Sequence, residues 1–193
     1  FEAARQVCKN AKIYQASSSE MYDGTTFPQT ESTPYKPRSP YGVSKLFAHE
    51  MARIYRESYD MFVACGILFN HEGPRRGIEF VTQKIVDTVV RQVCGAEIIL
   101  ELGNMKAQRD WSHSVDMVEG MWLMLQNDKP ENYILASGET HSIFDFVNMV
   151  YGYFGIDVNW YNTHEDAMFL PMGMDSAGKQ LVQSVDKYYR PNE

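Results

Sequence analysis

Two groups of polar side chains of the kind that move protons lie in the first quarter of the chain. The first is the run Ser17–Glu20, which follows the strand-like segment 12–16 (KIYQA). The second is the pair Tyr41 and Lys45, four residues apart and just after Pro40, a residue favoured in the first turn of a helix. Because residues four apart share a helix face, the Lys45 ammonium is expected beside the Tyr41 hydroxyl.

The chemistry of such a tyrosine–lysine pair is proton abstraction. A free tyrosine has a pKa near ~10, too high for a base at neutral pH, and a fixed positive charge nearby lowers that pKa. Tyr41 would then accept a proton from a substrate hydroxyl. For the pair alone, an exposed tyrosine and a solvated lysine are the commoner interpretation. Glu20 and the serines favour catalysis, because they follow a predicted parallel strand and ligands bind at the carboxyl ends of such strands.

Segments spread over nearly the whole chain resemble one enzyme family. They are 14–22 (YQASSSEMY), 37–45 (PRSPYGVSK), 68–77 (LFNHEGPRRG), 109–113 (RDWSH) and 185–193 (VDKYYRPNE). Together they resemble the extended short-chain dehydrogenase/reductases and, within these, the GDP-mannose 4,6-dehydratases. The set is far more specific than the tyrosine–lysine pair alone.

The resemblance implies an α/β fold, with part of an NAD(P)-binding Rossmann domain and a small substrate-binding lobe. Residues 1–155 are expected to form the carboxyl-side part of the dinucleotide-binding domain, with interleaved substrate-binding segments, and 156–193 part of the lobe. The family has a Gly-x-Gly-x-x-Gly fingerprint in its first strand-to-helix turn, and this sequence has none. We therefore expect the first half of the domain, and the family's last helices, to be absent from this chain.

The resemblance also implies a reaction that converts GDP-mannose to GDP-4-keto-6-deoxymannose. Tyr41 would take the proton of the sugar C4 hydroxyl while the C4 hydride passes to NADP, with Ser18 hydrogen-bonded near that hydroxyl and Lys45 lowering the tyrosine pKa. Ser18 stands where the family often has threonine. Glu20 would then remove the C5 proton and help expel the C6 hydroxyl as water, after which the hydride returns to C6.

Binding roles are carried over in the same way. Cofactor contacts are expected from Tyr41, Lys45, His71 and Arg76, and sugar-nucleotide contacts from Asn70, Val81, Lys84, Arg109, Arg190 and Glu193. The residues themselves support phosphate binding after the strand at 62–69, because the planar fork of arginine suits phosphate oxygens. A solvated turn with surface arginines is the alternative, as is a solvated charge for Lys84. Asp110 would fix an arginine or cap the next helix, and no metal ligands are expected.

Composition limits the partners. The formal net charge of -7 argues against general binding to nucleic acids or anionic membranes, and no apolar run is long enough to span a bilayer. The cysteines, Cys8, Cys65 and Cys94, are odd in number and widely spaced, so buried free thiols in a reducing cytoplasm are expected. By resemblance, the protein would be a homo-oligomer, a dimer or tetramer.

Hydrophobic periodicity predicts the elements that position these residues. Helices are expected at 41–59, 80–95, 142–155 and after 113, and strands at 62–69, 98–102 and 133–138. The proline-rich segment 21–40 is expected to be irregular. The predicted buried stripes include Val43, Leu46, Phe47, Met51, Ile54 and Tyr55 in the first helix, and Val115, Val118, Trp122 and Leu125 in the helix after 113.

Two rival functions remain open at this point. A sugar-nucleotide 4-epimerase of the same fold would share Tyr41 and Lys45, but it abstracts no C5 proton and needs no base such as Glu20. A non-catalytic sugar-nucleotide-binding fragment is the second rival, favoured by the lack of a glycine fingerprint. NADP and NAD are not distinguished, because the residues that read the ribose 2′ position belong to the half with that fingerprint.

Overall fold

The computed structural model describes residues 1–162 and 171–189, which fall into two compact units. The first unit comprises Phe1–Gly73 and Asp110–Glu139, and the second comprises Pro74–Arg109 and the described part of Thr140–Glu193. Among these residues, no helix combines the length and apolar character needed to cross a bilayer. The functional boundary expected after residue 155 stays a prediction.

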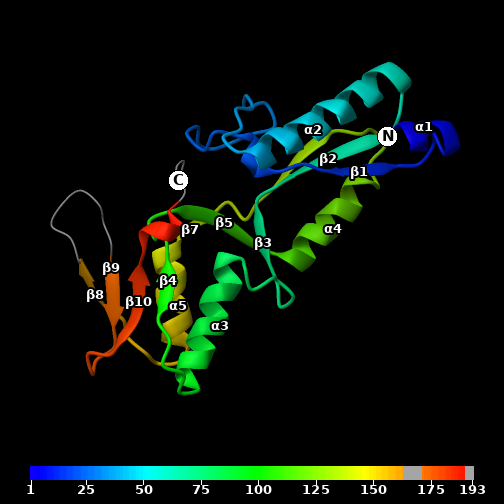
Figure 1. Cartoon of the computed structure of the whole chain (residues 1–193). Coiled ribbons are helices and arrows are strands. Elements are labelled where there is room, and N and C mark those ends of the chain that lie inside the picture. The colour runs from blue at the N-terminus through cyan, green and yellow to red at the C-terminus, as the bar shows by residue number, and fades with distance from the viewer. Residues whose placement is uncertain (163–170, 190–193) are drawn as a thin grey trace. The chain divides into compact units, whose positions relative to one another are not determined.

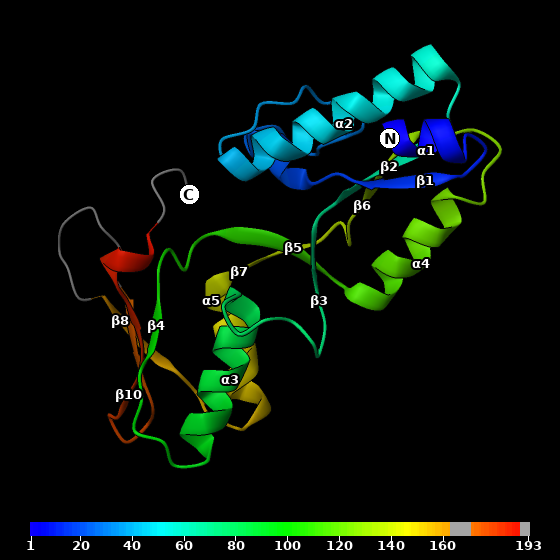
Figure 2. The same ribbon diagram turned by 45° about the vertical axis from the view of Figure 1, so that its right-hand side comes forward.

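The first unit is built on a parallel sheet with the strand order β1-β2-β6. The strands are β1 (Ile13–Ala16), β2 (Val63–Leu68) and β6 (Asn132–Leu135). Every residue of β2 is buried, as its continuous apolar run predicts for a strand covered on both faces. Helices α2 (Pro40–Tyr59) and α4 (Ser114–Met124) lie on opposite sides of this sheet (Figures 1 and 2).

Shorter elements complete the first unit. Helix α1 (Glu2–Val7) precedes β1, and the 3-10 helix η1 (Ser19–Met21) follows it. The irregular segment from η1 to α2 confirms the prediction for 21–40. Strand β3 (Asn70–Glu72) pairs in parallel with β5 (Gln108–His113).

The predicted start of α2 is confirmed, and residues next to it in sequence determine where the helix begins. Ser39 is the N-cap, and its Oγ accepts a hydrogen bond of 3.0 Å from the Gly42 N–H. Pro40 follows in the first turn, where its missing N–H costs nothing. The helix ends at Asp60, which adopts the left-handed conformation with φ of 53°.

The predicted buried faces of α2 and α4 are wrong in part. On α2, Val43 and Phe47 are 55% and 69% exposed, and Ile54 is 39% exposed. Tyr55 is buried as predicted, and the other buried residues of α2 are Gly42, His49 and Ala52. On α4, Val115, Val118 and Trp122 are all more than 60% exposed, whereas Met117 and Met124 are buried. Both helices carry apolar residues on more than one face, so periodicity alone predicts only part of the buried face.

The second unit contains a mixed sheet with the order β4-β10-β9-β8. The strands are β4 (Leu100–Leu102), β8 (Asn159–Asn162), β9 (Pro171–Met174) and β10 (Gln180–Ser184). Strand β10 is parallel to β4 and antiparallel to β9, and β9 is antiparallel to β8. Three of the four strands lie beyond residue 156, where the sequence pattern was too weak to predict regular elements.

Helices α3 (Val81–Val93) and α5 (Ile143–Tyr153) belong to the second unit, as do β7 (Thr140–Ser142) and the 3-10 helix η2 (Asp186–Tyr188). Gln92 of α3 is buried and links three elements. Its Nε2 donates to the carbonyls of Ile98 and Leu181, each at 2.8 Å, and its Oε1 accepts from the Tyr151 hydroxyl at 2.6 Å. This Gln92–Tyr151 network ties α3 and α5 to β10.

The cysteines are all free, as predicted, but only Cys65 is buried. Cys8 and Cys94 are exposed, which corrects the expectation of three buried thiols. Cys94 is the C-cap residue of α3 and Cys8 that of α1, and helix ends lie at the surface of each unit.

Candidate active site

The carboxyl end of β1 presents a buried hydroxyl and an exposed carboxylate in succession. Ser17 and Ser18 are 6% and 8% exposed, whereas Glu20 is exposed. Ser18 is the N-cap of η1, and its Oγ accepts a hydrogen bond of 3.2 Å from the Glu20 N–H. Because this bond uses the oxygen as acceptor, the Ser18 hydroxyl proton stays available for a ligand.

The first two turns of α2 bring the predicted tyrosine–lysine pair to the same strand end. Lys45 Nζ donates to the carbonyl of Ala16 at 3.1 Å and lies 5.5 Å from the centre of the Tyr41 ring. Tyr41 is 55% exposed. The shared helix face that the spacing predicts is therefore present, with the ammonium between the strand and the phenol ring.

Gly42 allows α2 and η1 to approach closely. A side chain at this position would place its Cβ 2.3 Å from the Glu20 carbonyl oxygen and 3.0 Å from Pro37 Cβ. The distance to the carbonyl oxygen is too short for a real Cβ against a backbone atom, so the turn that carries Tyr41 can lie this close to Glu20 only with glycine here. The first unit thus brings Ser18, Glu20, Tyr41 and Lys45 together.

Two further candidates in the first unit lie on β3. Asn70 and His71 pair with Trp111 and Ser112 of β5 and are half-buried. His71 Nδ1 lies 2.9 Å from the Phe69 carbonyl, which can only accept, so Nδ1 donates. In the neutral ring Nε2 is then an acceptor, suited to a hydroxyl or amide of a ligand.

Within the second unit, the candidates lie around the beginning of α3 and on β5. The Arg76 guanidinium lies 3.5 Å from the centre of the Phe80 ring, and Val81 is the first residue of α3. Lys84 Nζ donates to the Glu101 carbonyl at 2.6 Å and lies 3.8 Å from the centre of the Tyr188 ring. Arg109 donates to the Gln108 carbonyl. The predicted ligands Arg190 and Glu193 lie outside the described residues.

Asp110 does not cap the next helix, which was one of the two roles expected of it, and its role in fixing an arginine stays a prediction. Its carboxylate is buried and accepts from the Ser137 N–H and hydroxyl at 2.9 Å each, and from the Gly138 N–H at 2.8 Å. The N-cap of α4 is His113, whose Nδ1 accepts from the Val115 N–H. Asp110 therefore fixes the turn that follows β6.

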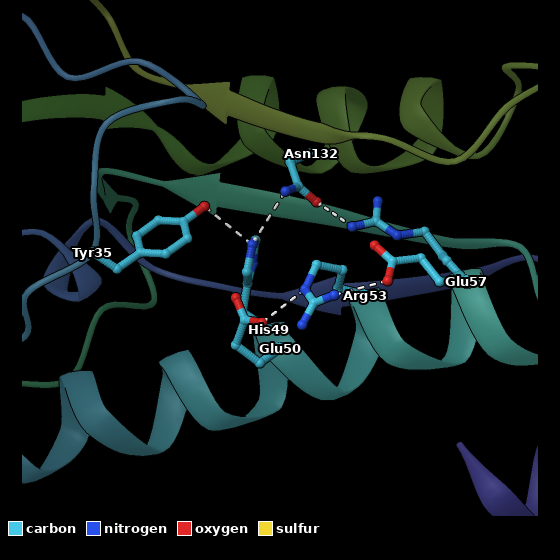
Figure 3. A network of polar contacts seen from close by, with 7 residues as sticks. Tyr35, His49, Glu50, Arg53, Glu57 and Asn132 are labelled. Atoms are coloured by element: carbon cyan, nitrogen blue, oxygen red, sulfur yellow. Dashed lines mark hydrogen bonds and ion pairs between the residues drawn. The ribbon is translucent and has the colours of Figure 1, made fainter.

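Sequence reasoning missed His49, which continues the Tyr41–Lys45 spacing by four more residues. Its ring is 1% exposed. Nδ1 lies 2.7 Å from Ser17 Oγ, and Nε2 lies 3.0 Å from the Tyr35 hydroxyl and 3.2 Å from Asn132 Nδ2. Figure 3 shows the ring between Tyr35 and Asn132. Burial, followed by the charges of Arg56 and Arg53, holds the pKa of His49 below its ordinary value.

Comparison with known proteins identifies the family. The family model described as GDP-mannose 4,6 dehydratase matches residues 1–193. This chain belongs to the GDP-mannose 4,6-dehydratase family. It is 48% identical to the GDP-mannose 4,6 dehydratase of Dictyostelium discoideum, over 96% of this chain and 51% of that protein. It is 45% identical to the one of Homo sapiens, over 95% of this chain and 49% of that protein.

The chain spans about half the length of these curated relatives of the GDP-mannose 4,6-dehydratase family. Among solved structures, it resembles dTDP-glucose 4,6-dehydratase from Bacillus anthracis in complex with NAD, with 26% identity and a TM-score of 0.71 over 80% of this chain and 49% of that one. RMD from Pseudomonas aeruginosa complexed with NADPH has a TM-score of 0.74 at 24% identity, covering 78% of this chain and 53% of that one, and shows the fold alone. The predicted α/β class, with a Rossmann-type parallel sheet flanked by helices, is confirmed.

Proposed function

We propose that this chain carries the catalytic residues of a GDP-mannose 4,6-dehydratase, a hydro-lyase that forms GDP-4-keto-6-deoxymannose. The observation that carries the proposal is the close approach at Gly42. It sets the Glu20 segment against the helix turn that bears Tyr41 and Lys45, in a member of this family. A base for the C5 proton thus lies beside the base for the C4 hydroxyl.

Each side chain has a defined task in the proposed reaction. Tyr41 accepts the C4 hydroxyl proton, and the Lys45 ammonium, held by the Ala16 carbonyl, offers positive charge beside the phenol. The Ser18 hydroxyl donates a hydrogen bond to the same sugar oxygen, since its Oγ already accepts one from the Glu20 N–H. Once C4 is a ketone, C5–H is acidified. Glu20 removes that proton and passes it to the departing C6 hydroxyl, which leaves as water. The proton held by Tyr41 then returns to C5 when the hydride is delivered to C6.

The residues present fit the nicotinamide end of a dinucleotide. The Tyr41 phenol is exposed, and the Lys45 ammonium has three donors, of which Ala16 uses one. NADP, when bound, would supply the group that accepts the C4 hydride and gives the hydride up again to C6. His71 and Arg76 would contribute further cofactor contacts. The choice of NADP over NAD rests on the family resemblance, since solved relatives include complexes with NAD and with NADPH.

The sugar nucleotide is GDP-mannose in this proposal. Arg109 binds its diphosphate, Asn70 the sugar end, and Val81 and Lys84 the guanine nucleotide, with Arg190 and Glu193 as further contacts. The protein acts as a homo-oligomer in the cytoplasm, without nucleic acid or membrane. The free cysteines fit a reducing compartment, and the exposed Phe47 and Ile54 of α2 fit contact with another subunit.

A 4-epimerase of the same fold is the main rival. A relative of that class, UDP-N-acetylglucosamine 4-epimerase from Methanobrevibacter ruminantium, has a TM-score of 0.76 but only 19% identity, over 100% of this chain and 55% of that one, so it shows the fold alone. Glu20 favours dehydration, because a 4-epimerase does not remove the C5 proton and needs no base there. A binding fragment without catalysis would have no use for Tyr41 beside Lys45.

The test is product formation by the purified protein with GDP-mannose and NADP, followed by NMR detection of the 4-keto-6-deoxy sugar. Glu20→Gln should abolish water loss, because the amide cannot accept the C5 proton. Glu119→Gln, which neutralises an exposed carboxylate of α4 in the same unit, is the matched control and should keep full activity. Dehydration by Glu20→Gln at the wild-type rate, or a 4-epimer as the product, would contradict the proposal.

A further inference from the structure

His49 is the third residue on the α2 face that carries Tyr41 and Lys45, but it is completely enclosed. With 1% of its surface exposed, its ring cannot touch a substrate. It is nevertheless hydrogen-bonded to Ser17, the residue that precedes Ser18. The bond to Ser17 thus connects His49 to the segment at the end of β1 that leads to Ser18 and Glu20.

The contacts of the imidazole determine which nitrogen carries the proton. Arg56 can only donate, and its Nη2 lies 2.8 Å from Asn132 Oδ1. This contact turns the amide nitrogen of Asn132 toward His49 Nε2, at 3.2 Å. Nε2 must then accept, from Asn132 and from the Tyr35 hydroxyl at 3.0 Å. The proton of the neutral ring is thus on Nδ1, which donates to Ser17 Oγ at 2.7 Å.

Ser17 receives this bond where the chain leaves the sheet. Its N–H donates to the Gly66 carbonyl at 3.0 Å, the last contact with β2 before η1 begins. The His49 bond fixes its side chain from the other side. Ser17 is thus held at both its backbone and its side chain, and the next residues are Ser18 and the Glu20 turn. A loss of the His49 bond would free the peptide that leads directly into the candidate catalytic segment.

We propose that His49 is a positioning residue for the dehydration, which holds Ser18 and Glu20 in register with Tyr41 by donating from Nδ1 to Ser17. This inference rests on the proposed function and extends it. The network joins four parts of the first unit: α2, the end of β1, the segment before α2 through Tyr35, and β6 through Asn132.

The ring has to be neutral for this role. A second proton on Nε2 would face the Asn132 amide N–H, and it would break the acceptor side of the network. Two of the charged groups around His49 are Glu50 and Arg53, which form an ion pair (Figure 3). Arg56 is the third. From the other packed elements, Tyr35 contacts the ring, and Cys65 is hydrogen-bonded to Ser17, the partner of the ring. Burial raises the pKa of both groups, so they are uncharged at neutral pH.

Two substitutions distinguish the hydrogen bond made by Nδ1 from those made by Nε2. The amide of His49→Asn reaches the position of Nδ1, so it can still donate to Ser17. The amide of His49→Gln reaches the position of Nε2, so it serves Asn132 and Tyr35 but not Ser17. If His49 acts through Ser17, His49→Gln and Ser17→Ala should each lower kcat by about 10–100-fold with little change in KM, as expected for loss of a group that orients a catalytic residue. His49→Asn should recover most of the wild-type kcat.

Tyr151→Phe is the control for effects on folding, because it removes a buried hydrogen bond in the second unit. All rates are expressed per folded molecule, with the folded fraction measured by circular dichroism at the assay temperature. Equal losses of kcat in the Asn and Gln variants would overturn the proposal. So would rates per folded molecule that match the wild type in all His49 variants.

Nitrogen NMR of the imidazole tests the geometry without any assay of activity. The purified protein should show a neutral His49 with its proton on Nδ1, and an Nε2–H tautomer overturns the proposal. A wild-type protein with the Nδ1–H tautomer that forms no 4-keto sugar would instead overturn the proposed function. The two failures are therefore distinguishable.

Discussion

The two units each contain a buried polar network, but the networks end on different groups. In the first unit, the bonds around His49 lead to Ser17, next to the candidate catalytic segment. In the second unit, the Gln92–Tyr151 network leads to the backbone carbonyls of Ile98 and Leu181. A buried hydrogen bond can thus orient a reactive segment or hold helices on a sheet, and its end point determines which.

The sheets of the two units also differ, both in strand direction and in the candidate groups near them. The first unit has an all-parallel sheet β1-β2-β6, and its candidate catalytic groups lie at or near the carboxyl end of β1. The second unit has a mixed sheet, and its candidate ligands Arg76 and Lys84 lie near the beginning of α3. We expect substitutions of these catalytic groups to change the chemical step, and substitutions in the second unit to change binding or stability.

The largest effect is expected from Tyr41→Phe. Without the phenol oxygen no base remains for the C4 hydroxyl, so kcat should fall by about 10³-fold, within the range for loss of a general base. Because Tyr41 is 55% exposed, thermal stability should not change. Steady-state kinetics and thermal melts measure the two quantities. Tyr59→Phe on the same helix is the control. A Tyr41 variant that keeps a tenth of the wild-type kcat would contradict the role of Tyr41 as the base and the assignment of the chemical step to the first unit.

Arg109→Ala should act on binding instead. Loss of a charge-assisted hydrogen bond to a diphosphate costs about 1.5–3 kcal/mol, so KM for GDP-mannose should rise about 10–100-fold, with a smaller change in kcat. Arg91→Ala is a matched control, because Arg91 is a solvent-exposed residue of α3, paired only loosely with Asp87 at 3.7 Å. If Arg109→Ala lowers kcat and leaves KM unchanged, the assignment of binding to this residue is wrong.

Tyr151→Phe should lower stability without lowering kcat. The substitution keeps the ring but leaves the buried Gln92 Oε1 without its 2.6 Å donor, which costs about 1–3 kcal/mol in the free energy of unfolding. Urea denaturation measures the loss. A fall in kcat per folded molecule would mean that the second network also supports the chemical step, against the contrast drawn between the units.

The smallest effect is a pH dependence of stability in the first unit. Burial lowers the pKa of His49 in the folded state, so the unfolded chain binds more protons just below its own pKa of about 6.5. Stability from this group is complete above that pH and falls as the pH decreases toward the lowered folded value, by at most about 1.4 kcal/mol per pH unit. Urea denaturation of the wild type and His49→Gln from about pH 5 to about pH 8 isolates this contribution. A difference between them that does not vary with pH would exclude it.

Sequence reasoning predicted the elements whose signals are local. The buried strand β2 is a continuous apolar run, and the start of α2 is marked by Pro40. The buried face of α2 was not predictable in the same way. Its helix approaches η1 through Gly42, so small residues and His49 are enclosed while Phe47 remains exposed. Hydrophobicity therefore ranks these positions in the wrong order.

The candidate site likewise contains residues that the sequence predicts and one that it does not. Ser18, Glu20, Tyr41 and Lys45 were found because each pair is close in sequence, and their roles remain predictions. His49 was missed because its partners Ser17 and Asn132 are 32 and 83 residues away along the chain. Its distance of four residues from Lys45 was the one available signal, and a histidine at that spacing is uninformative until the fold brings its partners together.

The bond between Lys45 and the carbonyl of Ala16 has a consequence for sequence variation. The ammonium is anchored to a peptide oxygen, which every amino acid provides, and the Ala16 side chain itself is exposed. Position 16 can therefore change in identity during evolution without moving the cation. The site depends here on the path of the main chain and leaves the choice of residue open.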